Sequence, residues 1–272
     1  MQTKTSTISP LAFVHPEAKI GKDVTIEPFA VVKEDTVIGD GTYLYSHAVI
    51  HPGARIGKEC KIFPGAVISA IPQDLKFEGE YTTVEIGDYT TIREYATIHR
   101  GTKYSFKTTV GSHVLLMAYS HVAHDCVIGD HAILANAVNL AGHVEIGDFA
   151  IIGGMSAVHQ FVKIGKHSIV SGGSVFGKDI PPFIKAARTP VSYAGVNSIG
   201  LRRRGFEADA ILKIQEIYRA IYLSGMNTTQ SLHYIETQFA PTIERDEILA
   251  FIRRSERGIV RGYVVNPEDE QA

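Results

Sequence analysis

An aliphatic side chain recurs at every sixth position over most of the first 180 residues. One run of this repeat extends without a slip from Val110 to Phe176, and an earlier run extends from Ile8 to Ile68. The fourth residue after almost every aliphatic one is small, as at Ala132 and Ser156. A six-residue period matches neither the α-helix nor the β-strand. It is typical of a parallel β-helix, in which each hexad forms one short strand and one corner around an aliphatic interior.

Glycines show how many hexads form one coil. They recur at intervals of 18 residues, or three hexads, so the predicted solenoid has three sides. The glycines in this register are Gly21, Gly39 and Gly57, and later Gly111, Gly129, Gly147 and Gly165. Between the two sets the spacing lengthens, which predicts extruded loops at about residues 69–83 and 101–109. Loops on a rigid scaffold commonly carry function.

The hexads end near Pro182, and a helical period follows. It predicts helices over about 206–224, 228–239 and 243–257, bounded by Gly225, Pro241 and Gly258. The expected fold class is therefore an all-β solenoid plus α, namely a parallel β-helix with a C-terminal helical domain. The expected domains are residues 1–190 for the β-helix and 191–272 for the helices.

Composition excludes some functions. The net charge of −2 gives no reason to expect nucleic-acid binding. The N-terminal residues lack a signal-peptide pattern and no apolar run is long enough for a membrane span, so we expect a cytoplasmic protein without stable membrane insertion. Cys60 and Cys126 both occupy the small interior position of a hexad, which favours core packing over a disulfide.

Histidines gather on the third side of the predicted prism, from which both loops also leave. Imidazole suits proton transfer near neutral pH. An alternative is that histidine merely tolerates exposed corners, as it does elsewhere in the chain. The clustered residues are His99, His121, His124, His143 and His159.

Six segments of the chain resemble those of one family. HVAHDC, IPQDLKFEGE, TIHRGT, LAGH, GGMSAVHQF and GLRRRGF are similar to the UDP-N-acetylglucosamine O-acyltransferases of lipid A biosynthesis, and the similarity covers nearly the whole chain. The resemblance implies a left-handed β-helix and a homotrimer with active sites between subunits. It also implies transfer of an (R)-3-hydroxyacyl chain from acyl carrier protein to the 3-hydroxyl of UDP-N-acetylglucosamine, with no metal and no cofactor.

The resemblance also assigns catalytic roles. His124 matches the family's general base. Asp125 is expected either to hold His124 or to bond across a subunit interface, because neighbours on a strand point apart. Gly142 lies one coil beyond His124, where a glycine leaves its backbone N–H open as an oxyanion donor. A plain corner glycine is the alternative.

The remaining matches concern substrates. Gly172 matches the position that limits acyl-chain length, and a glycine there predicts that long chains are admitted. This chain has Ile199 where the family often has Glu, which leaves uridine recognition open. Arginines near the C-terminal end also suit an acidic carrier protein. The expected substrate-binding residues are Gln73, Asp74, Lys76, His99, His121, His143, His159, Gln160, Asn197, Arg203 and Arg204.

Two other reactions stay open. A 3-amino sugar nucleotide as acceptor would give an amide instead of an ester. From another class, a trimeric β-helix can hold zinc on three histidines, as in γ-type carbonic anhydrases. The extruded loop and the arginine run are not needed for that chemistry.

Overall fold

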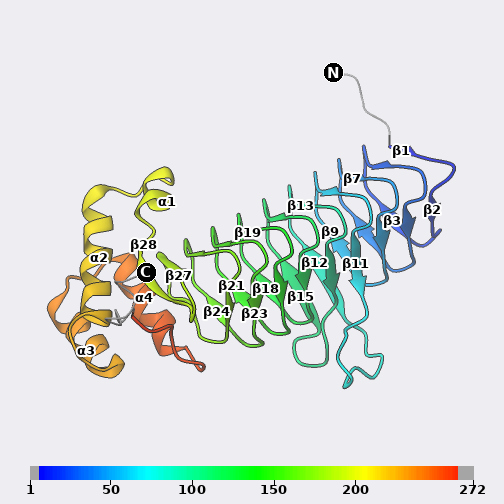
Figure 1. Ribbon diagram of the computed structural model, residues 1–272. Coiled ribbons are helices and arrows are strands. Elements are labelled where there is room, and N and C mark those ends of the chain that lie inside the picture. The colour runs from blue at the N-terminus through cyan, green and yellow to red at the C-terminus, as the bar shows by residue number, and fades with distance from the viewer. Residues whose placement is uncertain (1–5, 263–272) are drawn as a thin grey trace, which may run out of the picture.

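Three parallel sheets wrap into a long prism, with helices packed at its C-terminal end (Figure 1). The computed structural model describes residues 6–262, so the outer ends of the two predicted domains lie outside it. The sheets form a left-handed parallel β-helix, which confirms the predicted fold class.

Each sheet takes one strand from every coil. The sheet on the glycine-bearing side contains β3 (Lys19–Ile20), β6 (Val37–Ile38), β9 (Ala54–Ile56), β12 (Thr83–Ile86), β15 (Lys107–Val110), β18 (Val127–Ile128), β21 (Glu145–Ile146) and β24 (Lys163–Ile164). The second sheet contains β1 (Thr7–Ile8), β4 (Thr25–Ile26), β7 (Tyr43–Leu44), β10 (Lys61–Ile62), β13 (Thr91–Ile92), β16 (Leu115–Leu116), β19 (Ile133–Leu134), β22 (Ile151–Ile152) and β25 (Ile169–Val170), and β27 (Ile184–Ala187) and β28 (Ser192–Val196) extend it.

The third sheet leads to the histidine cluster. It contains β2 (Phe13–Val14), β5 (Val31–Val32), β8 (Val49–Ile50), β11 (Val67–Ala70), β14 (Thr97–His99), β17 (His121–Val122), β20 (Asn139–Leu140), β23 (Ala157–Val158) and β26 (Val175–Phe176). Register confirms the 18-residue coil, because Val122 pairs with Leu140 and Leu140 pairs with Val158. All three side chains are buried. Burial of each such side chain contributes about 1.5–3 kcal/mol, so the repeat itself supplies the core.

The corners turn through a left-handed backbone. The third residue after the aliphatic one has positive φ in coil after coil, as at Asp125 (59°), His143 (63°) and Phe161 (63°). These three residues follow strands of the third sheet, so they lie in one column along a single edge of the prism.

Both predicted loops leave the third sheet. Residues 71–82 connect β11 to β12, and residues 100–106 connect β14 to β15. Figure 1 shows them projecting side by side from the same edge.

The C-terminal region contains four helices among the described residues: α1 (Ser198–Arg203), α2 (Ala208–Tyr222), α3 (Thr228–Gln238) and α4 (Ile243–Arg253). α2, α3 and α4 match the expected helices. α1 and the antiparallel pairing of β28 with β27 were not predicted. Ile214 and Tyr218 of α2 are fully buried, and the Tyr218 hydroxyl donates to the Pro182 carbonyl at 2.5 Å, which ties the helices to the last coil. No described helix is long and apolar enough to cross a membrane.

Candidate active site

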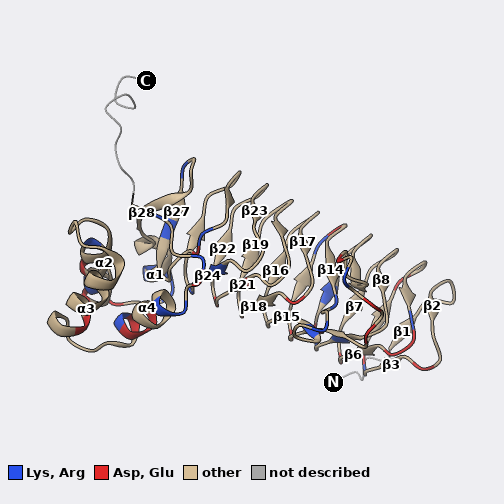
Figure 2. Ribbon diagram, turned by 90° about the horizontal axis from the view of Figure 1, so that it is seen from below, with Lys and Arg blue, Asp and Glu red and all other residues tan. Residues whose placement is uncertain are grey.

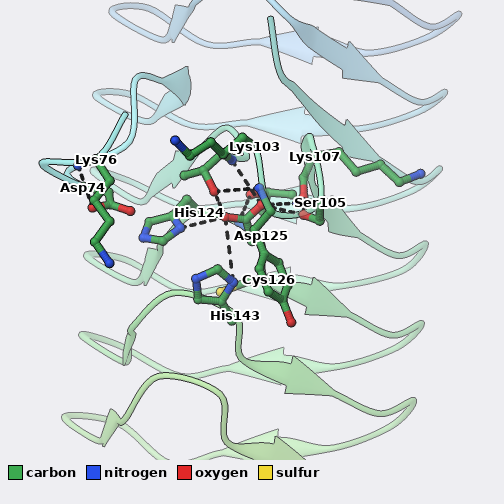
Figure 3. Close-up of polar contacts among 12 residues, drawn as sticks. Asp74, Lys76, Lys103, Ser105, Lys107, His124, Asp125, Cys126 and His143 are labelled. Carbon is green, nitrogen blue, oxygen red and sulfur yellow. Dashed lines mark hydrogen bonds and ion pairs between the residues drawn. The ribbon is translucent and has the colours of Figure 1, made fainter. Parts of the chain in front are cut away.

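His124, Gly142 and Gln160 occupy the same corner position on three successive coils. Each lies two residues after the aliphatic residue of a third-sheet strand, and successive coils are about 4.8 Å apart. Figure 3 shows His124 beneath the two extruded loops, with His143 on the next coil. The corner column therefore places an imidazole beside a glycine, as predicted from the spacing.

In the coils of His124, Gly142 and Gln160, the backbone amide at this corner position makes no hydrogen bond to another described residue. Pro16 and Pro52 occupy the same position in earlier coils, and proline has no N–H to donate. Among the described residues, no hydrogen bond from the Gly142 amide to another group is found. Gly142 therefore presents a free donor at the prism edge.

The glycine is also required sterically by the histidine above it. A Cβ added at Gly142 would lie 2.5 Å from Cε1 and 2.7 Å from Nε2 of His124. The Cε1–Nε2 edge of His124 thus rests directly over Gly142. A base nitrogen and a free amide are adjacent, which is the arrangement that acyl transfer requires.

Asp125 is buried and accepts several hydrogen bonds. Its Oδ1 accepts from the Ser105 hydroxyl at 2.5 Å and from the backbone N–H groups of Thr102 and Ser105 at 3.1 and 3.2 Å. Its Oδ2 accepts from the Thr102 hydroxyl at 2.7 Å and contacts His124 Nδ1 at 2.8 Å. Burial opposes the charge on Asp125, but the hydrogen bonds from His124, Ser105 and Thr102 outweigh it and hold the pKa of this carboxyl well below its ordinary range.

The ionised carboxylate determines the His124 tautomer. A carboxylate oxygen can only accept, so His124 Nδ1 must carry the proton in their hydrogen bond. Nε2 of the neutral ring is then left with a lone pair over Gly142. Asp125 was expected either to hold His124 or to bond across an interface, with the second favoured by the way neighbours on a strand point apart. Instead its positive φ turns the carboxylate back onto His124 of the same chain.

His143 and Phe161 form the wall next to this pair. The His143 ring stacks on Phe161 at 4.3 Å between centroids and meets Tyr104 edge-on at 4.4 Å. His143 Nδ1 lies 3.9 Å from Asp125 Oδ2. Burial lowers the pKa of His143, although the Asp125 carboxylate works in the opposite direction.

His99 and His121 lie on the other flank, on β14 and β17. Their rings meet edge-on at 4.9 Å, and His121 Nδ1 is 2.7 Å from the Thr97 hydroxyl. Burial, reinforced by His121, lowers the pKa of His99 to about 4. Burial, reinforced by His124, also lowers the pKa of His121. Both rings therefore favour the neutral form.

Loop 71–82 supplies Asp74 and Lys76 on the side of His124 away from Asp125 (Figure 3). Asp74 Oδ1 accepts from the Lys76 backbone N–H at 3.0 Å, which closes a turn at the loop tip. The Asp74 carboxylate is near enough to act on His143 electrostatically. Gln73 and Lys76 are exposed, so both are free to meet a ligand.

The other predicted residues lie elsewhere. His159 and Gln160 are exposed at the corner below Gly142. Gly172 follows β25, and Arg203 and Arg204 lie in or next to α1, where they line a hollow against β22 and β25 of the second sheet. Asn197 is buried, accepts from the Gly200 amide as the cap of α1 and donates to the His167 carbonyl at 2.8 Å. Within one chain the site residues thus occupy two separate faces.

Four contributors were missed from the sequence: Thr102, Tyr104, Ser105 and Phe161. The loop around the first three was expected, but nothing periodic in it indicates which side chain turns inward. Phe161 could have been found, because it occupies the corner position of Asp125 and His143 on the following coil.

A metal is conceivable at one place within residues 6–262. His124, Asp125 and His143 present ligand atoms within 4.8 Å of one another. These residues fit a metal poorly, however, because both Asp125 oxygens already accept hydrogen bonds and His124 Nδ1 donates to one of them. The geometry favours an acid–base pair over a zinc centre.

Comparison with known proteins assigns the chain to a class and then to a family. The model for bacterial transferase hexapeptide repeats matches residues 35–70 and 107–142, and the model for domain 2 of UDP-N-acetylglucosamine O-acyltransferase matches residues 179–260. With its β-helix, the chain is thus of the hexapeptide-repeat transferase class.

The names of individual relatives are more specific than the class. An acyl-[acyl-carrier-protein]–UDP-N-acetylglucosamine O-acyltransferase from Sulfurihydrogenibium is 50% identical over 93% of both chains. The enzyme of that name from Chlorobaculum parvum is 50% identical over 93% of this chain and 96% of its own. The solved UDP-N-acetylglucosamine acyltransferase from Bacteroides fragilis has a TM-score of 0.92 at 50% identity, covering 93% of this chain and 99% of that one. The chain belongs to the UDP-N-acetylglucosamine O-acyltransferase family, as the resemblance predicted.

Proposed function

We propose that this chain transfers an (R)-3-hydroxyacyl group from acyl carrier protein to the 3-hydroxyl of UDP-N-acetylglucosamine, the first step of lipid A biosynthesis. The named activity of the relatives supports this reaction. The observation that carries the mechanism is the edge of His124 lying over the free amide of Gly142, with Asp125 behind the ring.

In the proposed mechanism, His124 acts as the general base. Nε2 takes the proton of the sugar 3-hydroxyl as its oxygen attacks the thioester carbonyl, forming a C–O bond. The Gly142 amide donates to the oxyanion of the tetrahedral intermediate. The C–S bond then breaks, and the imidazolium returns its proton to the departing thiolate of the carrier. Asp125 accepts from Nδ1 throughout and stabilises the imidazolium. No metal and no free cofactor takes part.

Substrate binding is proposed for residues of both faces. Asp74 and Gln73 suit sugar hydroxyls, and Lys76 suits the pyrophosphate. His99, His121, His143, His159 and Gln160 line the approach to the base. Arg203 and Arg204 would meet the nucleotide, whereas the role of Asn197 is to set α1 beneath them, since its amide is already used. Gly172 would leave room for the acyl chain.

A homotrimer would join these two faces. The corner after the second sheet exposes a ladder of large side chains, including Phe29, Tyr95, Tyr119 and Met155, each more than half exposed. Contiguous exposed apolar side chains are typical of subunit contacts. A threefold assembly would bring the arginine hollow of one subunit toward the His124 edge of another.

The carrier protein is the proposed macromolecular partner, and the cytoplasm the proposed location. Figure 2 shows basic residues where α1 and α4 meet the last coils. Arg202 and Arg203 are exposed there, whereas Arg253 and Arg254 pair with Glu236 and Glu145. A surface with unneutralised arginines suits an acidic carrier.

The test is acyl transfer from 3-hydroxyacyl carrier protein to UDP-N-acetylglucosamine by wild type and His124→Ala. We expect the variant to lose about 10²–10⁴-fold in kcat, the usual contribution of a general base, with its thermal unfolding unchanged. An active variant would move the base elsewhere. If wild type is inactive, the 3-amino sugar nucleotide is the next acceptor to assay, and stoichiometric zinc with hydratase activity would overturn the proposal.

A further inference from the structure

We infer that loop 100–106 is a positioning element for the proposed base, in which Thr102 and Ser105 hold the Asp125 carboxylate so that it fixes the orientation and tautomer of His124. This inference rests on the proposed function for its kinetic consequence, but its structural part concerns the free protein. Both hydroxyls donate to Asp125, so both residues would act through it.

The loop donates to Asp125 four times from two residues. Thr102 and Ser105 each offer a backbone N–H and a hydroxyl, and the four bonds measure 2.5–3.2 Å. Three of them converge on Oδ1, and the Thr102 hydroxyl shares Oδ2 with His124. Donors on both oxygens fix the plane of the carboxylate. The plane in turn fixes where Nδ1 of His124 must lie.

The Ser105 hydroxyl has a second acceptor in reach, the Lys107 carbonyl at 2.8 Å. One hydroxyl hydrogen serves one strong bond at a time. Oγ could not approach an anionic oxygen to 2.5 Å without a hydrogen between them, so the hydrogen points to Asp125.

The loop is itself held in place. The Phe106 N–H donates to the Thr102 carbonyl at 2.8 Å, which closes the loop as a turn. The Lys103 N–H donates to Glu80 Oε1 at 2.9 Å, which links this loop to loop 71–82. Tyr104 packs edge-on against His143. Figure 3 shows the resulting chain of contacts from the loop through Asp125 to His124.

Two pairs of variants test the inference. Ser105→Ala and Thr102→Val remove one hydroxyl donor each, and Ser105→Thr and Thr102→Ser keep it. Lys103→Ala is the matched control in the same loop, because its exposed side chain pairs with exposed Glu78 and its N–H is retained. Trimer size and thermal unfolding establish that each variant folds.

The first readout needs no substrate. In histidine-labelled protein, ring nitrogen shifts report the share of His124 that carries its proton on Nδ1, with His124→Gln used for assignment. We expect that share to fall in Ser105→Ala and Thr102→Val, and to remain as in wild type in the hydroxyl-retaining variants and Lys103→Ala. An unchanged share in both donor-deleting variants overturns the inference, whatever the activity.

The second readout is the pH profile of transfer. Each donor-deleting variant should lose roughly tenfold to a hundredfold in kcat with KM within about twofold, as expected for removing a hydrogen bond to a charged group. The pH at which activity is lost on the acid side should also change, because the Asp125 carboxylate is no longer held in the same place beside the His124 ring. A fall in kcat with the same pH profile in both variants overturns positioning. If wild type transfers no acyl group while the donor-deleting variants still change the His124 tautomer, the result supports positioning and counts against the proposed function.

Discussion

At the scale of single residues, the site depends on one unusual backbone angle. Asp125 has a φ of 59°, and without it the carboxylate and the His124 ring would project apart, as adjacent strand residues do. The corner conformation of the hexad thus creates a histidine–carboxylate pair from consecutive residues. The same conformation at His143 and Phe161 stacks their rings beside the pair.

Gly142→Ala tests the contact between base and amide. The new Cβ would lie 2.5 Å from Cε1 of His124, so the ring must move, while the backbone of Gly142 is not in the left-handed region. We expect a loss of about 10²-fold or more in kcat, comparable to loss of an oxyanion donor, with little change in thermal unfolding. Glu34→Ala, at the same corner position of a distant coil, should retain wild-type rates. Because alanine keeps the backbone N–H, full activity of Gly142→Ala would show that the close contact between the His124 ring and Gly142 is not needed for transfer.

His99 predicts a pH dependence of stability. Its pKa in the folded state is about 4, lowered by burial, against an ordinary value near 6.5. The unfolded chain therefore binds the proton first, and stability is lost as pH falls from about 6.5 through 4. His99→Gln should make that loss shallower, measured as the denaturant midpoint at several pH values. Equal slopes for variant and wild type would show that His99 is not buried as a neutral ring.

At the scale of elements, the strands and the places where the loops leave follow from the sequence, whereas the paths of the loops do not. The six-residue period assigned every coil to its side, and with it the position of His124 above Gly142. Helical spacing likewise gave α2, α3 and α4. These predictions succeed because each coil repeats the same interior contacts.

The features that the sequence did not predict depend on contacts that occur at a single place in the fold and are not repeated from coil to coil. Thr102 and Ser105 turn toward Asp125 because of where their loop crosses the corner, and no period encodes that path. α1 was missed because it has only six residues and owes its start to the Asn197 cap. The return of β28 onto β27 is equally local. Asn197 was expected to bind substrate, and its residue type does not reveal that its amide caps α1 and donates to the His167 carbonyl.

The position of Lys76 in loop 71–82 predicts an effect on substrate affinity without an effect on the chemical step. Lys76 is exposed at the loop tip, near His124 but not bonded to it (Figure 3). Lys76→Ala should raise KM for the nucleotide sugar by roughly tenfold, as for a lost charged hydrogen bond, and leave kcat within about threefold. Lys61→Ala, exposed on β10, is the control. A loss confined to kcat would place Lys76 in the chemical step.

At the scale of the whole molecule, the two faces of the site are distributed over different sides of one prism. The proposed base lies after the third sheet, while Gly172 and the arginine hollow adjoin the second. If three chains combine, each active site draws its base from one and its groove from another. Sedimentation should then give a mass three times the 29.7 kDa of the chain.

Gly172→Met tests the proposed acyl groove. Gly172 is exposed, and the atom nearest an added Cβ is the Gly154 carbonyl oxygen at 3.0 Å, so a long side chain would project outward. We expect the variant to prefer shorter acyl chains, measured as the ratio of kcat/KM for 3-hydroxyacyl carriers of increasing length. Gln238→Met, at the surface of α3, is the control. An unchanged ratio would move the length limit elsewhere.

The corner position that carries His124 and Gly142 has one further consequence. Pro16 and Pro52, which cannot donate, fill it in two of the earlier coils, and residues that can donate fill it in the later ones. The coils of His124, Gly142 and Gln160 share this unused amide, whereas in the loop-bearing coil the Arg100 N–H donates to the Ala70 carbonyl at 3.0 Å. Reactivity along this edge is therefore set by a single residue per turn. Evolution could relocate or silence such a site by point substitutions, without altering the solenoid that supports it.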